Sequence, residues 1–554
     1  MAGTSNSRDK QRWKYSAVIA IISALLFIPF LGGVHLFDWD EINFAEISRE
    51  MLVTGEFSRV SIDFFPFYEK PPLFFWLQAA SMKILGINEF AARFPNAICG
   101  IISLIFLYNI GRKLHDHRFG ILWSLVYAGS VLPFLYFKSG IIDPVFNLFI
   151  FSSIYFFLKF KWERHFRFLI TSALLIGLAI LTKGPVAILI VSLCIIVFWI
   201  FNRFKFPIHL RQLLLFAGVS LVIPGIWFAY ESMVYGPSFV QEFIAYQWRL
   251  FSTPDAGHSG FPGFHLVVLL IGCFPASIFA IKAFRKLPGE ENLDQAEFRQ
   301  WMKYLFWVVL ILFSIVESKI IHYTSLCYFP LTYLAALVLY KLIIGELDFS
   351  RWLKAGLIGI ASLFIVIPML ATYLAIHPEF LISMVDQDEF ALNSLQADVN
   401  WTGLEVIPAL FLLTLLIAVL LQFKKNRYQA IKILFGGMAV YILFSLFFFI
   451  KRVEGYSQRA AVEFAEKKAA EDSYVINAGY KSYVPLFYSP RTAQFYPSFE
   501  SRKEKMEWML WGEIDKPVYI ITRIDKLEEV LSWTGAKEIA RKNGFVFLKR
   551  NDGN

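Results

Sequence analysis

Charged residues are scarce in this chain of 554 residues, and long polar stretches are few. Asp, Glu, Lys and Arg make up 18% of the sequence, whereas hydrophobic residues make up 57%. A typical soluble domain carries about 25% charged residues. Because the apolar residues also occur in long runs, the composition excludes a soluble enzyme with two separate cores. It predicts an α-helical polytopic membrane protein.

Cysteine is also scarce, and its positions exclude two further classes. The four cysteines all fall in apolar segments without metal-type spacing, which gives neither a disulfide framework nor a zinc knuckle. They are Cys99, Cys194, Cys273 and Cys327. The net charge of +9 would suggest a nucleic-acid partner in a soluble protein. In so apolar a chain it is better explained as loop charge that orients the spans, so no nucleic-acid partner is expected.

The hydrophobic runs predict about thirteen membrane spans, since each span needs about 20 apolar residues. Residues 1–14 are polar and basic, and the apolar run 16–33 that follows is too long for a signal peptide and has no small-residue cleavage site. We therefore expect a retained first span. The others are predicted near 94–111, 119–137, 144–160, 168–182, 184–201, 213–231, 264–282, 304–318, 322–343, 355–376, 403–423 and 433–450.

Lys and Arg are concentrated in alternate connecting segments, which predicts the orientation. The basic segments are the N-terminus, 112–118, 159–167, 202–212, 282–303, 341–354 and 424–432. The positive-inside rule places these in the cytoplasm. An odd number of spans then puts residues 451–554 on the outer side. We predict a membrane domain over 1–450 and a separate domain over 451–554.

The composition changes in the C-terminal region. Short β-like runs at 473–477, 518–522 and 544–548 alternate with charged helical stretches such as 526–532. This alternation predicts a small soluble α/β domain on the outer face of the membrane.

The first external region, 35–93, does not fit a simple span-and-loop scheme. Asp38-Trp39-Asp40-Glu41 precedes a stretch to residue 54 in which Phe44, Ile47, Ser48 and Met51 share one helical face. This pattern predicts an interfacial amphipathic helix lying on the membrane. Tyr68-Glu69-Lys70-Pro71-Pro72 and a second short apolar stretch, 73–85, follow. Two membrane-parallel helices in one loop indicate a built site at the outer interface.

Two of these residues also have structural explanations. Asp40 is a suitable N-cap for a helix beginning at Glu41, because Asp is among the best capping residues. Lys70 could be an interfacial lysine that snorkels toward water before a Pro-Pro helix start. These roles are compatible with function, and charged residues beside spans are costly and usually functional.

Further polar residues recur at the predicted outer ends of spans. They are Asp143, Lys183, Arg249, His258, Lys319 and Tyr323. A transporter would instead place its charges near the midplane on broken helices. Cations at a lipid interface can hold a departing lipid phosphate, and a carboxylate can act beside an acceptor as base or electrostatic stabiliser. The pattern favours transfer of a sugar from a lipid-linked phosphate.

Several stretches of the sequence resemble a known family. Asp40-Glu41 with the following residues 44–51, and Tyr68-Glu69-Lys70-Pro71-Pro72 downstream, are similar to hallmarks of the GT-C membrane glycosyltransferases. Within these they resemble the group of aminoarabinose-to-lipid-A transferases (ArnT-like) and protein O-mannosyltransferases. Leu181-Thr182-Lys183-Gly184-Pro185, and Gly257-His258 with Pro262, are weaker matches. The resemblance covers residues 15–450.

The resemblance implies roles for the candidate residues. Asp40 would be the principal catalytic carboxylate, with Glu41 beside it and Asp143 at the second external turn. Donor-phosphate binding would fall to Lys70, Arg249, Lys183, Lys319 and Tyr323. Glu69 and His258 could share a divalent metal (zinc, magnesium or manganese), and His265 is a rival for the histidine. Asp38 is a second nearby carboxylate, so that either aspartate could be the base.

The resemblance also implies an activity. We expect an inverting glycosyltransferase of the bacterial cytoplasmic membrane that takes a sugar from a polyprenyl-phosphate donor, undecaprenyl phosphate above all. The expected acceptor is lipid A or another envelope glycolipid, with a protein Ser or Thr hydroxyl as the alternative. From other classes we retain a transporter of lipid-linked sugar or ions, and a sensor whose outer C-terminal domain binds a ligand.

Overall fold

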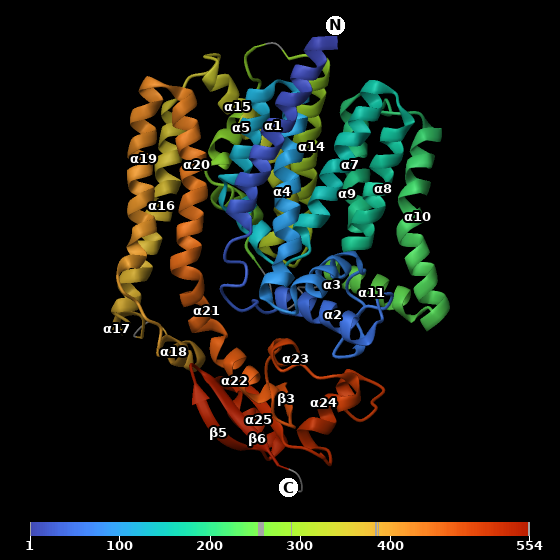
Figure 1. Ribbon diagram of the computed structural model, residues 1–554, viewed down its shortest axis with the longest axis vertical. Helices are drawn as coiled ribbons and strands as arrows, with labels where there is room; N and C mark the ends of the chain where they lie inside the picture. Colours follow the sequence, from blue (N-terminus) through green and yellow to red (C-terminus); the bar gives the residue numbers. More distant parts are fainter. Residues whose placement is uncertain (1, 253–259, 290, 383–384, 386, 552–554) are drawn as a thin grey trace.

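The protein consists of a long helical body and a small mixed α/β tail at one end (Figure 1). The computed structural model describes residues 2–252, 260–289, 291–382, 385 and 387–551. The helices of the body are α1 (Ala2–Phe27), α4 (Glu89–Leu114), α5 (His117–Ala128), α6 (Val131–Leu135), η1 (Tyr136–Lys138), α7 (Asp143–Glu163), α8 (Phe166–Lys183), α9 (Val186–Phe201), α10 (Leu210–Tyr235), α11 (Ser238–Ser252), α12 (Phe264–Gly272), α13 (Ala276–Ala283), α14 (Leu293–Ile315), η3 (Ile321–Cys327), α15 (Tyr328–Ile343), α16 (Arg351–Ile376), α17 (Glu379–Ile382), α18 (Glu389–Leu395), η4 (Leu404–Val406), α19 (Ile407–Lys425) and α20 (Arg427–Ser445).

Within the described residues, 9 helices are long and apolar enough to cross a membrane, and the number rises to 11 if each of two bent pairs is one span. The bent pairs are His117–Ala128 with Val131–Lys138, and Phe264–Gly272 with Ala276–Ala283. The protein is therefore a multi-pass membrane protein, as the sequence predicts. The predicted number of about thirteen spans is higher than this count.

The difference comes from α1 and α9. Both run alongside the spanning helices in Figure 1. Four basic residues, Arg8, Lys10, Arg12 and Lys14, lie in the first half of α1, and its apolar part ends at Phe27. Helix α9 has only 16 residues. A helix of that length rises about 24 Å, less than the about 30 Å of a bilayer core. The sequence prediction counted both as full spans.

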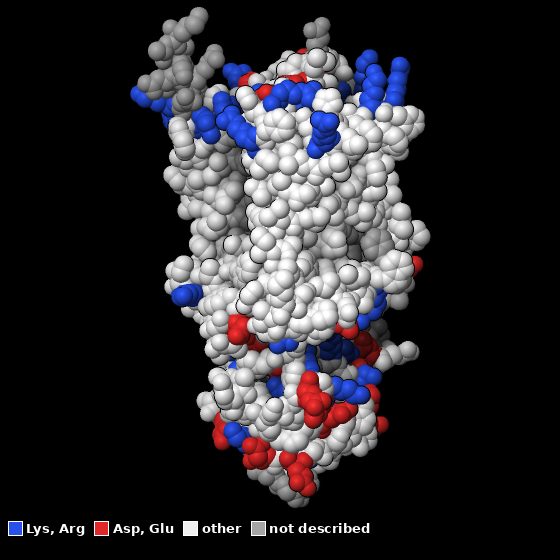
Figure 2. Space-filling model, turned by 90° about the vertical axis from the view of Figure 1, so that its right-hand side faces the viewer, with Lys and Arg blue, Asp and Glu red and all other residues white. Residues whose placement is uncertain are grey.

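The charges lie at the two ends of the molecule, as the predicted orientation requires. In Figure 2, Lys and Arg side chains gather at the end opposite the tail, above a broad band without charge. Charged side chains of both signs surround the junction between this band and the tail. The N-terminus and the tail lie at opposite ends (Figure 1).

The first external region folds between the body and the tail. It contains α2 (Asp40–Thr54), the two-stranded hairpin of β1 (Ser61–Ile62) and β2 (Phe65–Pro66), and α3 (Leu73–Leu85). Helix α2 ends at Gly55, which takes the left-handed conformation with φ of 77°. Such an ending is common because glycine carries no Cβ penalty there. The two predicted helices of this region are therefore present.

The tail is a mixed four-stranded sheet with helices. Its strands are β3 (Tyr474–Asn477), β4 (Val518–Arg523), β5 (Lys537–Lys542) and β6 (Phe545–Arg550), in the order β3-β4-β6-β5. Strands β3 and β4 are parallel, and the other pairs are antiparallel. Its helices are α22 (Arg459–Ala469), α23 (Val484–Tyr488), η6 (Ala493–Phe495), α24 (Arg502–Trp511), η7 (Ile524–Lys526) and α25 (Leu527–Thr534). Strand β5 is fully exposed and was not predicted, because its sequence is charged rather than apolar.

The helix of the last span extends beyond the membrane toward the tail. Helix α20 runs through η5 (Leu446–Ile450) into α21 (Lys451–Ser457) as one helix of 31 residues. The boundary predicted at residue 450 therefore falls inside a helix. This continuity ties the position of the tail to the last span.

The polar face of helix α2 does not lie in water, unlike that of an amphipathic helix with one exposed face. All residues from Glu41 to Met51 are buried. Arg49 pairs with Glu46 and donates to the carbonyl of Arg491 in the tail, with an N–O distance of 3.3 Å. Burying such a polar face is tolerable only when its groups are hydrogen-bonded. The tail supplies part of that cover.

Candidate functional site

A cavity of about 770 Å³ opens where α2, α7 and α8 meet η3 and the tail. Its volume lies within the about 300–1,000 Å³ typical of ligand sites. Eight residues named from the sequence line it: Asp38, Asp40, Glu41, Glu69, Lys70, Asp143, Lys183 and Tyr323. They come from segments far apart in the sequence, so the fold alone brings them together.

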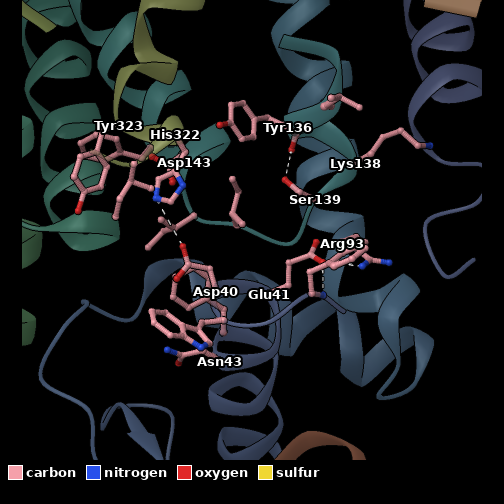
Figure 3. Close-up of a pocket in the computed structure, with 18 of the residues that line it drawn as sticks. Asp40, Glu41, Asn43, Arg93, Tyr136, Lys138, Ser139, Asp143, His322 and Tyr323 are labelled. Carbon is pink, nitrogen blue, oxygen red and sulfur yellow. Dashed lines mark hydrogen bonds and ion pairs between the residues drawn. The ribbon is translucent and has the colours of Figure 1, made fainter. Parts of the chain in front are cut away.

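Asp40 is the first residue of α2, and its side chain faces the cavity. Its Oδ2 lies 3.8 Å from Nε2 of His322, and the side chain is 43% exposed. Figure 3 shows both groups pointing toward one space, with Asp143 and Tyr323 close by. The N-cap position is held by Trp39, without a side-chain capping bond. Asp40 is therefore not the N-cap, and its carboxylate is available to a bound molecule.

Glu41 turns away from Asp40 and forms a buried ion pair with Arg93 of α4. Two bonds join them, with N–O distances of 3.0 and 2.7 Å, and Glu41 also accepts the backbone N–H of Gly140 at 2.5 Å. Burial opposes ionisation, but the charge of Arg93 lowers the pKa of Glu41 below its ordinary value. Glu41 stays charged and fixes the start of α2 against α4 and the 139–142 turn.

Asp143 and Lys183 form a second ion pair in the cavity wall. The Nζ–Oδ1 distance is 2.6 Å, and Asp143 is 2% exposed. The ammonium of Lys183 also lies 5.4 Å from the ring centre of Tyr323. Asp143 begins α7 and Lys183 ends α8, so the pair joins the outer ends of two neighbouring spans.

Gly184 ends α8 immediately after Lys183, and two features require a glycine there. Its φ is 91°, a conformation that other residues rarely adopt. A Cβ at this position would also lie 2.7 Å from Cζ of Phe243 in α11. The close approach of α11 to the cavity therefore depends on this residue.

Lys70 lies in the loop before α3, next to Tyr246 of α11. Its Nζ is 3.5 Å from the Tyr246 hydroxyl and 4.9 Å from the ring centre. The Arg249 guanidinium lies 5.1 Å from the same ring. Burial lowers the pKa of the Lys70 ammonium from its ordinary value, against the charge of Glu69. A buried lysine of this kind gains from an anion beside it.

Two predicted residues do not line the cavity, and the position of a third is not described. Arg249 is exposed and Lys319 donates to the backbone carbonyl of Ser314 at 2.7 Å; neither is among the lining residues. His258 lies outside the described residues. Over the described ranges, no group of three or more His, Cys, Asp and Glu side chains could hold a metal. Glu69 alone gives no ligand set, so we derive no step through a metal.

Several polar lining residues were not selected from the sequence. Among them are His322, Tyr246, Lys481 and Tyr483. His322 directly precedes Tyr323 and could have been found by its position in the run 317–330. Lys481 and Tyr483 belong to the tail, where no motif marks them. The backbone N–H of Tyr483 donates to Asp38 at 3.2 Å, and burial raises the pKa of Asp38 to about 6. Asp38 thus connects the tail to the start of α2.

Apolar side chains form the remainder of the wall. They include Phe30, Leu31, Val186, Ile190, Leu443, Leu446 and Phe447. Phe30 and Phe447 are 71% and 63% exposed, so this wall is open to the surface of the molecule. The cavity therefore combines a charged end with an apolar side, an arrangement that suits an amphiphilic molecule carrying an anionic group.

Comparison with known proteins gives matches of three kinds. Residues 69–228 match the family described as dolichyl-phosphate-mannose-protein mannosyltransferase. An undecaprenyl phosphate-alpha-4-amino-4-deoxy-L-arabinose arabinosyl transferase of Pectobacterium atrosepticum is 26% identical over 62% of this chain and 64% of its own length. The like-named protein of Photorhabdus laumondii is 27% identical over 58% of each chain. The chain thus spans less than two thirds of these relatives.

The structural match covers nearly the whole chain. ArnT from Cupriavidus metallidurans, solved with undecaprenyl phosphate bound, superposes with a TM-score of 0.76 and 18% identity, over 97% of this chain and 98% of that one. The apo structure gives 0.74. These scores define the class: a polytopic helical membrane protein with the ArnT fold, including the tail. Within this class, the chain is similar in sequence, at a distant identity, to the aminoarabinosyl transferases, and its fold agrees with the resemblance noted in the sequence.

Proposed function

We propose that this protein transfers a sugar from undecaprenyl phosphate, or another polyprenyl phosphate, to lipid A or a related envelope glycolipid. The reaction takes place on the outer face of the bacterial cytoplasmic membrane. The observation that carries the proposal is the single cavity in which Asp40, Lys70 and the Asp143–Lys183 pair meet an apolar wall. The names of the relatives and the lipid bound to the solved ArnT support this donor.

Each part of the cavity has a role in this reaction. The apolar wall takes the first part of the polyprenyl chain, and Lys70 holds the donor phosphate by charge-assisted hydrogen bonds. Lys183 lies in the same cavity, oriented by Asp143. Lys70 is partly shielded from water, so the phosphate gains more from it than it would from a fully solvated lysine.

The transfer step exchanges one C–O bond for another. An acceptor oxygen attacks the anomeric carbon opposite the phosphate, and the bond between that carbon and the phosphate oxygen breaks. The bonding electron pair stays on the leaving polyprenyl phosphate, whose added charge Lys70 stabilises. The configuration at the anomeric carbon is inverted. The step needs no further reactant.

Asp40 acts on the acceptor side. A hydroxyl acceptor must lose its proton, and the Asp40 carboxylate receives it. A phosphate acceptor is already ionised at neutral pH, and Asp40 then stabilises the positive charge that develops on the sugar. Nε2 of His322 lies 3.8 Å from the Asp40 carboxylate, close enough for the imidazole to help orient the acceptor oxygen.

A protein acceptor is the second candidate. It is favoured by the match of residues 69–228 to a family whose description names a protein mannosyltransferase. In that case the acceptor oxygen is a Ser or Thr hydroxyl, and base catalysis by Asp40 becomes essential.

Mass spectrometry of envelope lipids tests the proposal. A deletion strain is complemented with the wild type or with Asp40→Asn, and lipid A and the polyprenyl-phosphate pool are measured in the same cells. We expect the deletion to remove one sugar mass from lipid A while the lipid-linked sugar accumulates. Asp40→Asn should fail to restore transfer, since a general base contributes about 10²–10⁴-fold.

The other outcomes distinguish between the acceptors. If lipid A is unchanged but the lipid-linked sugar accumulates, the acceptor is a protein, which glycoproteomics then identifies. If neither pool changes although the protein is present, the transferase function is excluded.

A further inference from the structure

A second cavity, of about 400 Å³, lies in the tail at the end of β3. The transfer reaction as proposed does not use it. Its lining comes from residues 477–483, four residues spread along α24 and Trp533 of α25. We call it the tail pocket. Lys481 and Tyr483 line both the tail pocket and the larger cavity, so the two are neighbours that share a wall.

The tail pocket is basic. Its lining includes Lys481, Arg502 and Lys503, and none of its twelve lining residues is acidic. The nearby carboxylates are only weakly engaged with these cations. Asp63 lies 3.5 Å from Arg502 but 2.5 Å from the buried Lys505, and the exposed pair of Lys503 and Glu507 is 3.7 Å apart. Such a concentration of one charge attracts an anion.

Aromatic rings complete the lining. Tyr480, Tyr483 and Trp533 contribute to it, and Trp533 is 44% exposed. Rings with an apolar body and a polar tip suit a ligand that is itself part apolar and part polar. The turn at Gly479 has a φ of 79°, and a Cβ there would lie 2.9 Å from Cβ of Lys526. The turn carries Lys481 into the space between the two cavities.

The tail pocket is coupled to the catalytic carboxylate through few bonds. Tyr483 donates its backbone N–H to Asp38, two residues before Asp40. The indole of Trp39 donates to the carbonyl of Lys481 at 2.8 Å, and the Lys481 ammonium lies 4.7 Å from the centre of that ring. A molecule held in the tail pocket therefore lies next to the part of the larger cavity that is formed by the start of α2.

We infer that the tail pocket binds the anionic sugar head group of the glycolipid acceptor. The cations take a phosphate or carboxylate of the head group, and the rings lie against its sugar. This inference rests on the proposed function. It places recognition of the acceptor in the tail and the chemistry in the membrane part, and it favours a charged glycolipid over a neutral protein segment.

Binding of a simple sugar phosphate tests the inference. The full chain in lipid nanodiscs is titrated with glucose 1-phosphate, glucose and inorganic phosphate, and binding is followed by saturation-transfer NMR of the sugars and ³¹P line widths. We expect glucose 1-phosphate to bind more tightly than either part. Lys503→Gln should raise its Kd about fivefold, because one charge-assisted contact is lost in a partly exposed site. Added salt should weaken binding as well.

Matched variants separate the pocket from general effects. Lys537→Gln removes an exposed tail lysine on β5, outside the pocket, and should leave the Kd unchanged. Trp533→Ala should weaken binding, and Trp533→Phe should retain most of it. The same nanodiscs are assayed for undecaprenyl phosphate, whose binding Lys503→Gln should not alter.

Two results of the titration would overturn the inference, and a third would reassign the pocket. Equal affinity for glucose and glucose 1-phosphate, or an unchanged Kd in Lys503→Gln, overturns the inference. A neutral Ser-containing peptide that binds in competition with glucose 1-phosphate would assign the pocket to a protein acceptor instead. A wild type that does not bind undecaprenyl phosphate would contradict the proposed donor. The assignment of the tail pocket would then still be decided by the glucose 1-phosphate titration.

Discussion

Asp40 and Glu41 are neighbours in the sequence, yet their side chains have different environments. Asp40 is partly exposed to the cavity, whereas Glu41 and Arg93 are both almost completely buried. Glu41→Gln should therefore cost stability, since breaking a buried ion pair costs about 3–5 kcal/mol. We expect a lowered Tm for Glu41→Gln in detergent and an unchanged Tm for Asp40→Asn. A Glu41→Gln variant as stable as the wild type would show that the pair with Arg93 does not hold α2.

The buried ammonium of Lys70 leads to a dependence on pH. Burial lowers the pKa of Lys70, so the group loses its charge at a lower pH than a solvated lysine does. Binding of undecaprenyl phosphate should be complete below this pKa and decline as the pH rises through it. Lys70→Arg should keep its affinity further into the alkaline range, because arginine stays protonated. A titration of binding against pH for both proteins measures this. Coincident profiles would mean that Lys70 does not hold the phosphate.

The predictability of the site differs from residue to residue. Asp40 and Lys70 were selected from the sequence because a charged residue in an apolar setting is costly, and both line the cavity. Residue type could not separate Asp40 from Glu41, since the difference arises from Arg93, 52 positions away. Lys481 could not be predicted from the sequence, because only the docking of the tail brings it next to Trp39.

At the scale of elements, the position of α11 depends on Gly184. Gly184→Ala would place a Cβ against Phe243 and force a positive φ on alanine. We expect α11 to shift, together with Tyr246, and the affinity for undecaprenyl phosphate to fall about tenfold, equivalent to about 1.4 kcal/mol. Gly218→Ala in α10 is the control, because a Cβ there meets nothing within 4 Å. Equal affinities in the two variants would show that α11 does not shape the donor site.

Helix α2 shows what periodicity predicts and what it omits. The apolar face from Phe44 to Met51 was correctly identified, and it is buried. The charged face was expected in water, but Arg49 and Glu50 are covered as well. A periodic pattern reveals which residues avoid water; it does not reveal that another domain covers the rest.

The contact between the tail and the first external region should be measurable by itself. Lys505 and Asp63 form an ion pair with side chains 3% and 4% exposed. Lys505→Ala leaves Asp63 buried without its closest cation, and breaking such a pair costs about 3–5 kcal/mol. We expect faster hydrogen exchange in the β1–β2 hairpin and in α24, with the β4–β6 pairing of the tail unchanged. Lys503→Ala, on the same helix but exposed, should exchange as the wild type does.

At the scale of the whole molecule, hydrophobicity locates the spans, and the predicted number is too high because α9 is short and the first half of α1 is basic. The nine long spans each overlap a predicted one, and both bent pairs fall within single predicted runs. Hydrophobicity cannot detect the break at residues 129–130 or the bend of 116° between α12 and α13, because all of these residues are apolar or small. Bends of this kind depend on packing against neighbouring helices.

The orientation of the molecule can be tested with single cysteines. Basic residues are concentrated at the end opposite the tail (Figure 2), and the positive-inside rule places that end in the cytoplasm. All four native cysteines are buried, so the wild type should react slowly with a membrane-impermeant maleimide. Lys503→Cys in the tail should be labelled in spheroplasts, whereas Lys425→Cys, at the end of α19, should be labelled only after lysis. The reverse pattern would place the cavity on the cytoplasmic side and would contradict an outward-facing transferase. A cytoplasmic marker protein that stays unlabelled before lysis shows that the preparation does not leak, and the unreactive wild type shows that the native cysteines do not contribute to the labelling.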